Sequence, residues 1–253
     1  MPAPILYCGD TNLEGAASYL AGLMTHFGWA FDYVPSHVPM TRELIERPHS
    51  LLILSDYPAS QFDEELQKIA LKQVGRGVGL LMIGGWESFH GLGGDWERTS
   101  IGETLPVEMG TRDDRVNFPQ PTLLARDYGI AEHAVLSNLP WDEQPPSIGG
   151  LNRVEAKPGT ETALFAVPHK VYVQSADFIF EAKKPYPALV LGKQSRGRTA
   201  AFMSDVAPHW VGGFVDWGPK RIKAQAAGAS AIEVGSYYAQ FWKQLLSWVG
   251  RLE

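Results

Sequence analysis

The sequence predicts an α/β fold with a mostly parallel sheet and helices on both of its faces. Short apolar runs alternate with segments whose apolar residues recur at helical spacing. The apolar runs are nearly continuous, as expected for strands buried on both faces. The length of 253 residues suits one large α/β unit. We therefore expect a single domain over residues 1–253, with a hairpin and a helix near its C-terminal end.

The first part of the chain supplies the parallel strands. Residues 4–7 (PILY) form an apolar run, and the apolar residues of 13–27 follow a helical period. Gly28 stands where the glycine that ends a helix is usually found. The remaining elements predicted in this part are strands at 30–34, 50–55 and 78–83 and a helix at 63–74.

The second part is less regular. Several prolines interrupt residues 110–158, and we expect this segment to wrap the sheet instead of forming a second domain. A helix with one apolar face is predicted at residues 237–252. Strands are predicted at 162–167, 171–174, 188–191 and 199–202, the last two joined by a turn at 195–197 into a hairpin.

Composition excludes several classes of partner. A net charge of −6 without a basic run provides no surface for nucleic acid. No run approaches the roughly 18 apolar residues that a membrane span needs, and the N-terminus lacks the basic region of a signal peptide. Cys8 is the only cysteine, which excludes an internal disulfide and a multi-cysteine metal site. We expect a cytoplasmic protein without a metal or cofactor, and self-association stays open.

Ligands of parallel sheets bind where the strands end at their carboxyl edge. Asp10, Ser55-Asp56 and Gly84 follow the first, third and fourth predicted strands. The segment from Asp205 to Trp210 also follows a predicted strand. We therefore expect the Gly84 and Asp205 segments to line one crevice, with Glu87 or His90 within roughly 10 Å of Asp205 or His209, a separation that one ligand can span.

The run from Gly84 to Gly91 (GGWESFHG) carries a family resemblance. With Trp96, Thr99 and Leu105-Pro106-Val107, it resembles the motif of the putative glutamine amidotransferase family, in the class I glutamine amidotransferase-like superfamily. Four further blocks match: Asp113-Asp114-Arg115, residues 145–152, Gly197-Arg198, and Ser204-Asp205 with Pro208-His209-Trp210. The resemblance covers nearly the whole chain and implies a flavodoxin-like sheet.

The resemblance also implies a chemistry, which this chain does not match. A glutaminase of the superfamily needs an exposed cysteine on the sharp turn between a strand and a helix. Cys8 instead ends the first strand, where we expect a small buried apolar residue. We therefore predict that the protein does not hydrolyse glutamine by the usual cysteine mechanism.

Four residues are the candidates for catalysis: Glu87, His90, Asp205 and His209. Carboxylate and imidazole groups can act as general acids and bases, and an Asp-His pair can orient the imidazole. Each also has a structural alternative. Glu87 suits a helix N-terminus, His90 suits a hydrogen-bonded loop, and Asp205 and His209 suit a tie within a loop.

The candidates for ligand binding are Gly84, Gly85, Trp86, Ser88, Trp96 and Trp210. Backbone N–H groups of the glycine pair would stabilise an anion, or the pair forms only a close turn. The tryptophans would suit a sugar or nucleoside, or belong to the core. Ser88 would replace the missing thiol only with a histidine as its base.

These features favour a protein that binds or hydrolyses a small molecule. Two alternatives stay open: a true amidotransferase with an atypical nucleophile, and a non-catalytic interaction module. The sequence does not decide whether the protein is an enzyme, and it does not identify the ligand.

Overall fold

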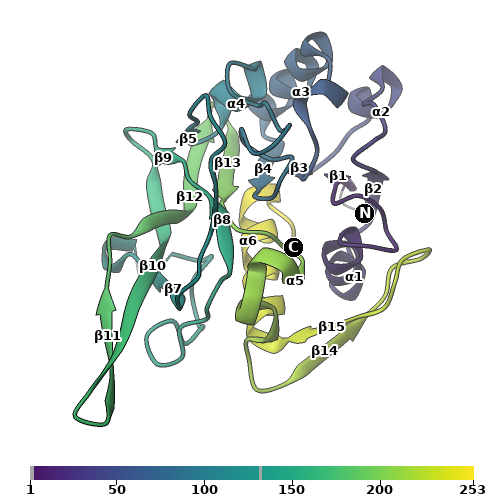
Figure 1. Ribbon diagram of the computed structural model, residues 1–253. Coiled ribbons are helices and arrows are strands. Elements are labelled where there is room, and N and C mark those ends of the chain that lie inside the picture. Colours follow the sequence, from purple (N-terminus) through teal and green to yellow (C-terminus); the bar gives the residue numbers. More distant parts are fainter. Residues whose placement is uncertain (1–2, 131–132) are drawn as a thin grey trace.

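A computed structural model describes residues 3–130 and 133–253. Five strands of its large sheet lie in the order β2-β1-β3-β4-β13, and all pair in parallel (Figure 1). This confirms the predicted parallel strands. Their bounds are β1 Ile5–Gly9, β2 Phe31–Val34, β3 Leu51–Ser55, β4 Gly79–Ile83 and β13 Gly197–Phe202.

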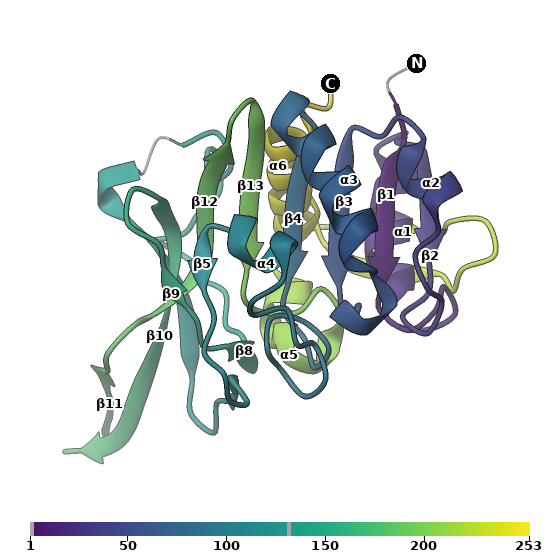
Figure 2. The same ribbon diagram turned by 90° about the horizontal axis from the view of Figure 1, so that it is seen from above.

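Helices cover both faces of the parallel strands, as predicted. Helices α2, α3 and α4 lie on one face, and α1 and α6 lie on the other (Figures 1 and 2). Helix α3 begins at the side chain of Asp63, which accepts the Glu65 N–H, and ends at Gly77, whose φ is 126°. The bounds are α1 Ala17–His26, α2 Arg42–Glu46, α3 Glu64–Arg76, α4 Ser100–Thr104, α5 Pro208–Val211 and α6 Ser236–Gly250, with 3₁₀ turns η1 Ala59–Gln61, η2 Tyr128–Ile130 and η3 Gly212–Asp216.

Antiparallel strands extend the sheet beyond β13. Strands β12 (Tyr186–Gln194) and β13 form the predicted hairpin, and β10 pairs with β12, β11 and β7. The predicted break between residues 167 and 171 is wrong. Strand β10 (Glu161–Gln174) runs through Pro168, which pairs with Thr122 of β7 (Thr122–Arg126), while β11 spans Asp177–Ala182.

The segment after α4 forms two short strand pairs outside the large sheet. Strand β5 (Val107–Glu108) pairs with β9 (Glu155–Ala156), and β6 (Arg115–Asn117) pairs with β8 (Gly150–Asn152). Another part of the same segment, β7, belongs to the large sheet itself through its pairing with β10. A hairpin of β14 (Arg221–Ala224) and β15 (Ile232–Gly235), not predicted, packs near α1 and α6.

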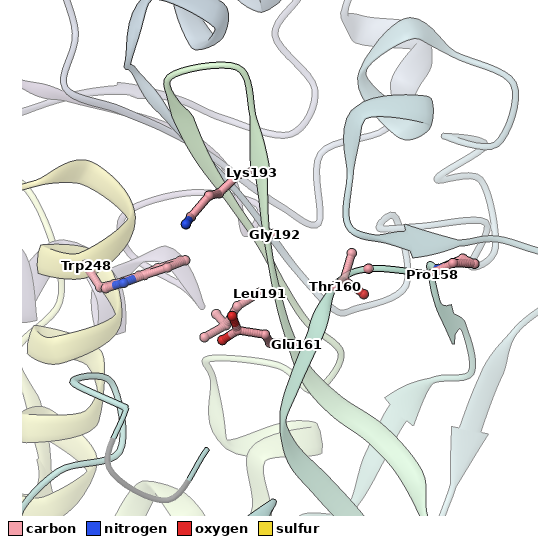
Figure 3. Close-up of a pocket in the computed structure, with 8 residues that line it drawn as sticks. Pro158, Thr160, Glu161, Leu191, Gly192, Lys193 and Trp248 are labelled. Atoms are coloured by element: carbon pink, nitrogen blue, oxygen red, sulfur yellow. The ribbon is translucent and has the colours of Figure 1, made fainter. Parts of the chain in front are cut away.

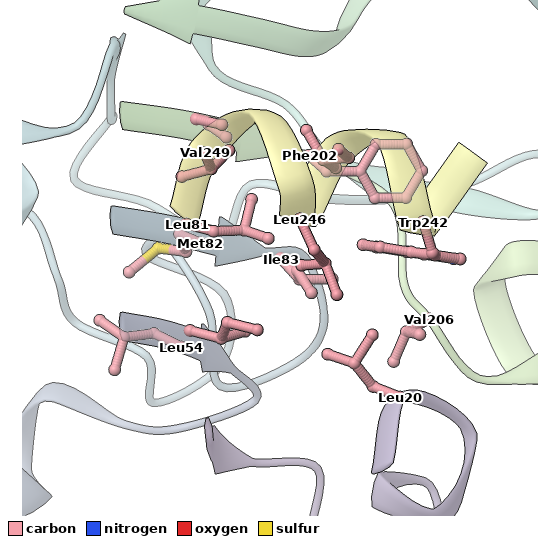
Figure 4. Packing of buried hydrophobic residues seen from close by; sticks show 14 of the residues in the cluster. Leu20, Leu54, Leu81, Met82, Ile83, Phe202, Val206, Trp242, Leu246 and Val249 are labelled. Carbon is pink, nitrogen blue, oxygen red and sulfur yellow. The ribbon is translucent and has the colours of Figure 1, made fainter. Parts of the chain in front are cut away.

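Helix α6 provides a large part of the core. Its apolar face lies against β4, β13 and α1, where Trp242 and Leu246 face Phe202 and Ile83 (Figure 4). The predicted docking of this helix is confirmed. Within the described residues, no helix combines the length and apolar character that crossing a membrane requires. The buried residues of α6 include Tyr238, Phe241, Trp242, Leu245, Leu246 and Val249.

Candidate functional site

Three aspartates gather at the carboxyl edge of the parallel strands. Asp10, Asp56 and Asp205 follow β1, β3 and β13, respectively. Asp10 and Asp205 are 1% and 7% exposed. Asp10 and Asp56 have positive φ angles of 51° and 46°, a conformation that non-glycine residues adopt rarely and that recurs at functional sites. The carboxyl edge is therefore unusual in both its burial of ionisable groups and its backbone conformation.

Asp10 is held by two hydroxyl groups. The Tyr7 hydroxyl donates to Asp10 Oδ2, and Ser55 Oγ donates to Asp10 Oδ1 over 3.0 Å. Burial raises the pKa of Asp10 well above its usual range, and the charges of Asp205 and Asp56 raise it further. Electrostatic coupling therefore joins the three carboxyl groups.

Asp56 is bonded to the turn that follows β4. Its Oδ1 accepts the Glu87 N–H over 2.7 Å, and its own N–H donates to Ser88 Oγ over 2.9 Å. A Cβ atom at Gly85 would lie 2.1 Å from Asp56 Oδ1, so the close approach requires glycine. Burial, followed by the charge of Asp205, raises the pKa of Asp56 to about 8. This carboxyl group therefore changes charge near neutral pH.

Asp205 lies at the turn that leads into α5. Its Oδ1 accepts the N–H groups of Val206 and Ala207, over 2.6 and 3.0 Å. Burial raises the pKa of Asp205 to about 6, although these N–H groups and the nearby His209 act in the opposite direction. Pro208 begins the short helix α5, which carries His209 at the surface. Asp205 and His209 therefore interact through charge at this edge.

The Gly84 and Asp205 segments come together here. The rings of Trp86 and His209 lie 6.4 Å apart. Trp86 is 47% exposed, and the Arg115 guanidinium lies 4.4 Å from the centre of its ring. Glu87 is half-buried, and burial raises its pKa. An exposed aromatic surface thus adjoins the carboxyl cluster.

The glycine pair forms a close turn. Gly84 N–H donates to the carbonyl oxygens of Phe202 and Ser204, and Gly85 N–H donates to Asn152 Oδ1 over 2.9 Å. Both donors are therefore used within the protein. The close-turn alternative describes Gly84 and Gly85, and an anion-binding role for their N–H groups has no geometric support.

A buried pair missing from the predicted site holds the same loop. Asp114 accepts the N–H groups of His90 and Gly91, each over 3.1 Å, and the Asn152 side-chain amide over 2.7 Å. Asp114 is 4% exposed and Asn152 is fully buried. Both belong to motif blocks noted in the sequence, which was the available signal. They are positioning residues for the loop after β4.

His90 faces two carboxylates, Glu97 and Asp95, that lie outside the aspartate cluster. Its Nδ1 lies 2.9 Å from Glu97 Oε2 and 3.9 Å from Asp95 Oδ1. The hydrogen bond to Glu97 raises the pKa of His90. The loop alternative therefore describes His90 better than a shared site with Asp205. One ligand atom from each of His90, Asp95 and Glu97 lies within 4.8 Å of the others, so these residues are the part of the loop that could hold a divalent cation.

Three predicted ligand-binding side chains lie inside the protein. Trp96 is fully buried and its indole N–H donates to the Tyr57 carbonyl, and Trp210 is 1% exposed and donates to Asn117. Ser88 is 1% exposed, and its oxygen accepts the Asp56 N–H. The expectation that these residues line a pocket is corrected to a packing role for the tryptophans and a positioning role for Ser88.

Cys8 is fully buried in β1. Burial raises the pKa of its thiol strongly. Because the thiolate is the nucleophile, this environment opposes reactivity. The expected burial of Cys8 is confirmed.

A separate hollow of about 270 Å³ lies between β10, β12 and α6 (Figure 3). Glu161, Lys193 and Trp248 line it together with Thr160 and Leu191. None of its lining residues belongs to the carboxyl cluster or to the predicted site.

Comparison with solved structures supports the fold. Cytoplasmic protein STM3548 from Salmonella typhimurium superposes with a TM-score of 0.73 at 23% identity, covering 97% of this chain and 98% of that one. Cytoplasmic protein STM1381 from Salmonella typhimurium LT2 gives 0.72 at 23% identity, covering 97% and 99%. A ThuA-like protein from Parabacteroides merdae gives 0.56 at 13% identity, covering 99% and 90%. At these identities the likeness concerns the fold alone.

Comparison with protein families shows the family to which the chain belongs. No protein of curated function matches the sequence. The family model described as "Putative glutamine amidotransferase" matches residues 11–251, which is nearly the whole chain. The matched region includes the loop after β4, the Asp114 block and the Asp205 segment. The chain therefore belongs to the putative glutamine amidotransferase family.

Proposed function

We propose that the protein binds a small polar molecule at the carboxyl edge of its parallel strands and acts on it by acid-base chemistry that uses no thiol. The observation that carries this proposal is the coupled cluster of Asp10, Asp56 and Asp205 beside the exposed ring of Trp86. We also propose that the sheet is flavodoxin-like, because its parallel strands follow the order β2-β1-β3-β4-β13. The cytoplasm is the proposed compartment, because the two similar Salmonella proteins are described as cytoplasmic.

The protonation of the cluster indicates the class of ligand. At neutral pH a carboxyl with a pKa of about 8 is mostly protonated and can donate as well as accept a hydrogen bond. Asp205 has a pKa of about 6, so at neutral pH it is mostly ionised and only accepts hydrogen bonds. Such a pair suits hydroxyl groups, and the Trp86 ring suits the apolar face of a sugar or nucleoside. We therefore favour a neutral polyhydroxylated ligand.

The same pair can support hydrolysis. A protonated carboxyl can act as general acid while an ionised carboxyl acts as general base toward water. Asp56 is the proposed acid and Asp205 the proposed base, with Glu87 and His209 beside them. The buried state of Cys8 and the use of Ser88 Oγ as an acceptor argue against a covalent amidotransferase mechanism.

Ligand binding is tested by saturation-transfer NMR with a panel of monosaccharides and nucleosides. We expect at least one compound to bind the wild-type protein, and Trp86→Ala and Asp56→Ala to reduce its affinity at least about tenfold, because each removes a direct contact. Tyr128→Ala is the matched control. Tyr128 is also an exposed aromatic residue whose ring contacts an arginine, Arg126. Its replacement should leave binding unchanged. Equal loss in the control, or no binding by any compound, would contradict the proposal.

Glutaminase activity is tested separately. We expect ammonia release from glutamine to stay at background in both the wild-type protein and Cys8→Ser. Release that Cys8→Ser abolishes would mean that this thiol reaches the site after all, and the true amidotransferase alternative would replace our proposal.

A further inference from the structure

The ends of β10 and β11 form an arm that projects from the sheet (Figures 1 and 2). We define the arm as residues 169–183. Its side chains Val173, Phe178 and Phe180 are 65%, 71% and 57% exposed. Large apolar groups with this exposure are costly to leave in water, and they mark interaction surfaces when they cluster.

These side chains share one face of the arm. In the register of β10 and β11, Val173 lies opposite Phe178, and Val171 lies opposite Phe180. Alternate residues of a strand point to the same side, and directly opposed residues do too. Val171, Val173, Phe178 and Phe180 therefore form a continuous apolar face.

The outer edge of β11 also has backbone N–H and C=O groups that point away from β10. Ser175 and Ala176, with φ angles of 51° and 70°, form a two-residue turn, so the flanking pair Gln174 and Asp177 is a hydrogen-bonded pair. Residues 177, 179 and 181 therefore bond to β10, and residues 178, 180 and 182 direct their N–H and C=O groups outward. The N–H of Lys183, which donates to the Pro168 carbonyl over 2.8 Å, follows this alternation.

We propose that this edge pairs with the same edge of a second copy of the chain. Strand β11 ends the order of the large sheet among the described residues. An antiparallel pair about a two-fold axis at Phe180 would place Phe180 opposite its symmetry mate and Phe178 opposite Ala182. Both are pairs of outward-directed residues, so every free backbone group of the edge from 178 to 182 finds a partner.

The charges of the arm select the same register. With Phe180 on the axis, Asp177 of each copy faces Lys183 of the other. A shift by two residues in one direction places Asp177 opposite Glu181, and a shift in the other direction places Glu181 opposite itself. Directly opposed like charges destabilise a sheet, and opposite charges stabilise it. One register therefore satisfies the backbone, the charges and the aromatic rings together.

The other edge of the arm lacks this complementarity. The free part of β10, residues 170–174, carries one charged side chain, Lys170, so self-pairing there would gain no ion pair. At the base of that edge, His169 N–H already donates to the Pro121 carbonyl. The self-complementary charge pattern of β11 is the reason to favour a second copy over an unrelated protein.

The oligomeric state is tested by sedimentation equilibrium of the full chain. We expect a reversible dimer, and Asp177→Lys or Phe180→Ser to raise its dissociation constant at least about tenfold. Combining Asp177→Lys with Lys183→Asp should restore much of the affinity, since the opposed charges are exchanged. Circular dichroism confirms folding of each variant. A wild-type monomer at the highest soluble concentration, or a dimer insensitive to these changes, would overturn the proposal.

The register is tested by oxidative cross-linking. Phe180→Cys should form a disulfide between two copies, because the Cα atoms of a hydrogen-bonded antiparallel pair lie about 5.5 Å apart, within disulfide reach. Phe178→Cys is the matched control, which should cross-link only when combined with Ala182→Cys. The native Cys8 is buried and does not compete. Equal cross-linking of Phe180→Cys and Phe178→Cys, or none by Phe180→Cys, would contradict the register.

Discussion

The carboxyl edge of the parallel strands and the projecting arm depart from ordinary burial in opposite directions. At the edge, Asp10 and Asp205 are almost fully buried although they can carry charge. In the arm, Phe178 and Phe180 are mostly exposed although they are large and apolar. Burying a charge and exposing an apolar face both cost folding free energy. The comparison indicates that each region is shaped by something other than the stability of a single chain.

The two regions also differ in how they are held. A hydrogen-bonded network that includes Asp114 and Asn152 fixes the loop beside the carboxyl cluster. The arm is a two-stranded ribbon that extends beyond the layered body (Figure 1). We therefore expect changes near the edge to alter stability and pH dependence, and changes in the arm to alter association. The following predictions test that division.

The largest effect is expected from the helix that supports the edge. Deleting residues 237–253 removes six large buried side chains of α6. At about 1.5–3 kcal/mol each, their loss is comparable to the whole stability of a typical domain, about 5–15 kcal/mol. The truncated protein should not fold, as measured by circular dichroism and thermal unfolding. An unchanged melting temperature would show that α6 is dispensable.

Asp114→Ala should have the next largest effect. It leaves the N–H groups of His90 and Gly91 and the amide of Asn152 without their acceptor. We expect the free energy of unfolding to fall by about 2–4 kcal/mol, because buried polar groups without partners are costly. Urea denaturation measures this. Asp113→Ala, at the neighbouring exposed carboxylate, is the control and should cost less than about 1 kcal/mol.

The pH dependence of stability should report on Asp56. Its folded pKa of about 8 exceeds the ordinary value of 3.8, so the native state favours the protonated form. That contribution is complete below the ordinary pKa and is lost as the pH rises toward 8. As the pH rises from 5 to 8, the free energy of unfolding should fall in the wild-type protein. In Asp56→Asn this fall should be smaller by about 1–3 kcal/mol. Parallel pH profiles for the two proteins would contradict the shift.

The smallest effect is expected in the arm. In dilute solution, where the protein is monomeric, Phe178→Ser should change the free energy of unfolding by less than about 0.5 kcal/mol. The reason is that a ring that is 71% exposed contributes little to the core. Urea denaturation at low protein concentration provides the measurement, and a loss above about 2 kcal/mol would show that the ring is packed within the chain.

Local patterns predicted the parallel half of the fold well. Nearly continuous apolar runs and helical periodicity located β1, β3, β4 and α3 to within a few residues, and Gly28 follows the end of α1 as predicted. The short pairs β5 with β9 and β6 with β8 were not predicted. Their partners are far apart in the sequence and their two or three residues carry no periodicity, so nothing local signals the pairing.

The sequence predicted the edge of the sheet where the candidate site lies better than it predicted the roles of individual residues. Strand ends pointed to the edge where the aspartates gather and to Asp10 and Asp56, because position along a parallel sheet follows from chain order. The sequence left the burial of Trp96 and Trp210 as one of two alternatives, since it depends on their distant partners Tyr57 and Asn117. For the same reason the sequence could not show that Asp114 and Asn152 hold the loop.

The central claim is that the aspartates at the carboxyl edge form a coupled group that titrates near neutral pH. Carbon-13 NMR of the aspartate carboxyl groups, recorded from pH 3 to 9, tests it directly. The resonance lost in Asp56→Asn should titrate near pH 8, and the resonance lost in Asp205→Asn should titrate near pH 6. Titration of both groups near their ordinary value of 3.8 would contradict the account, because neither would then differ from a solvent-exposed aspartate.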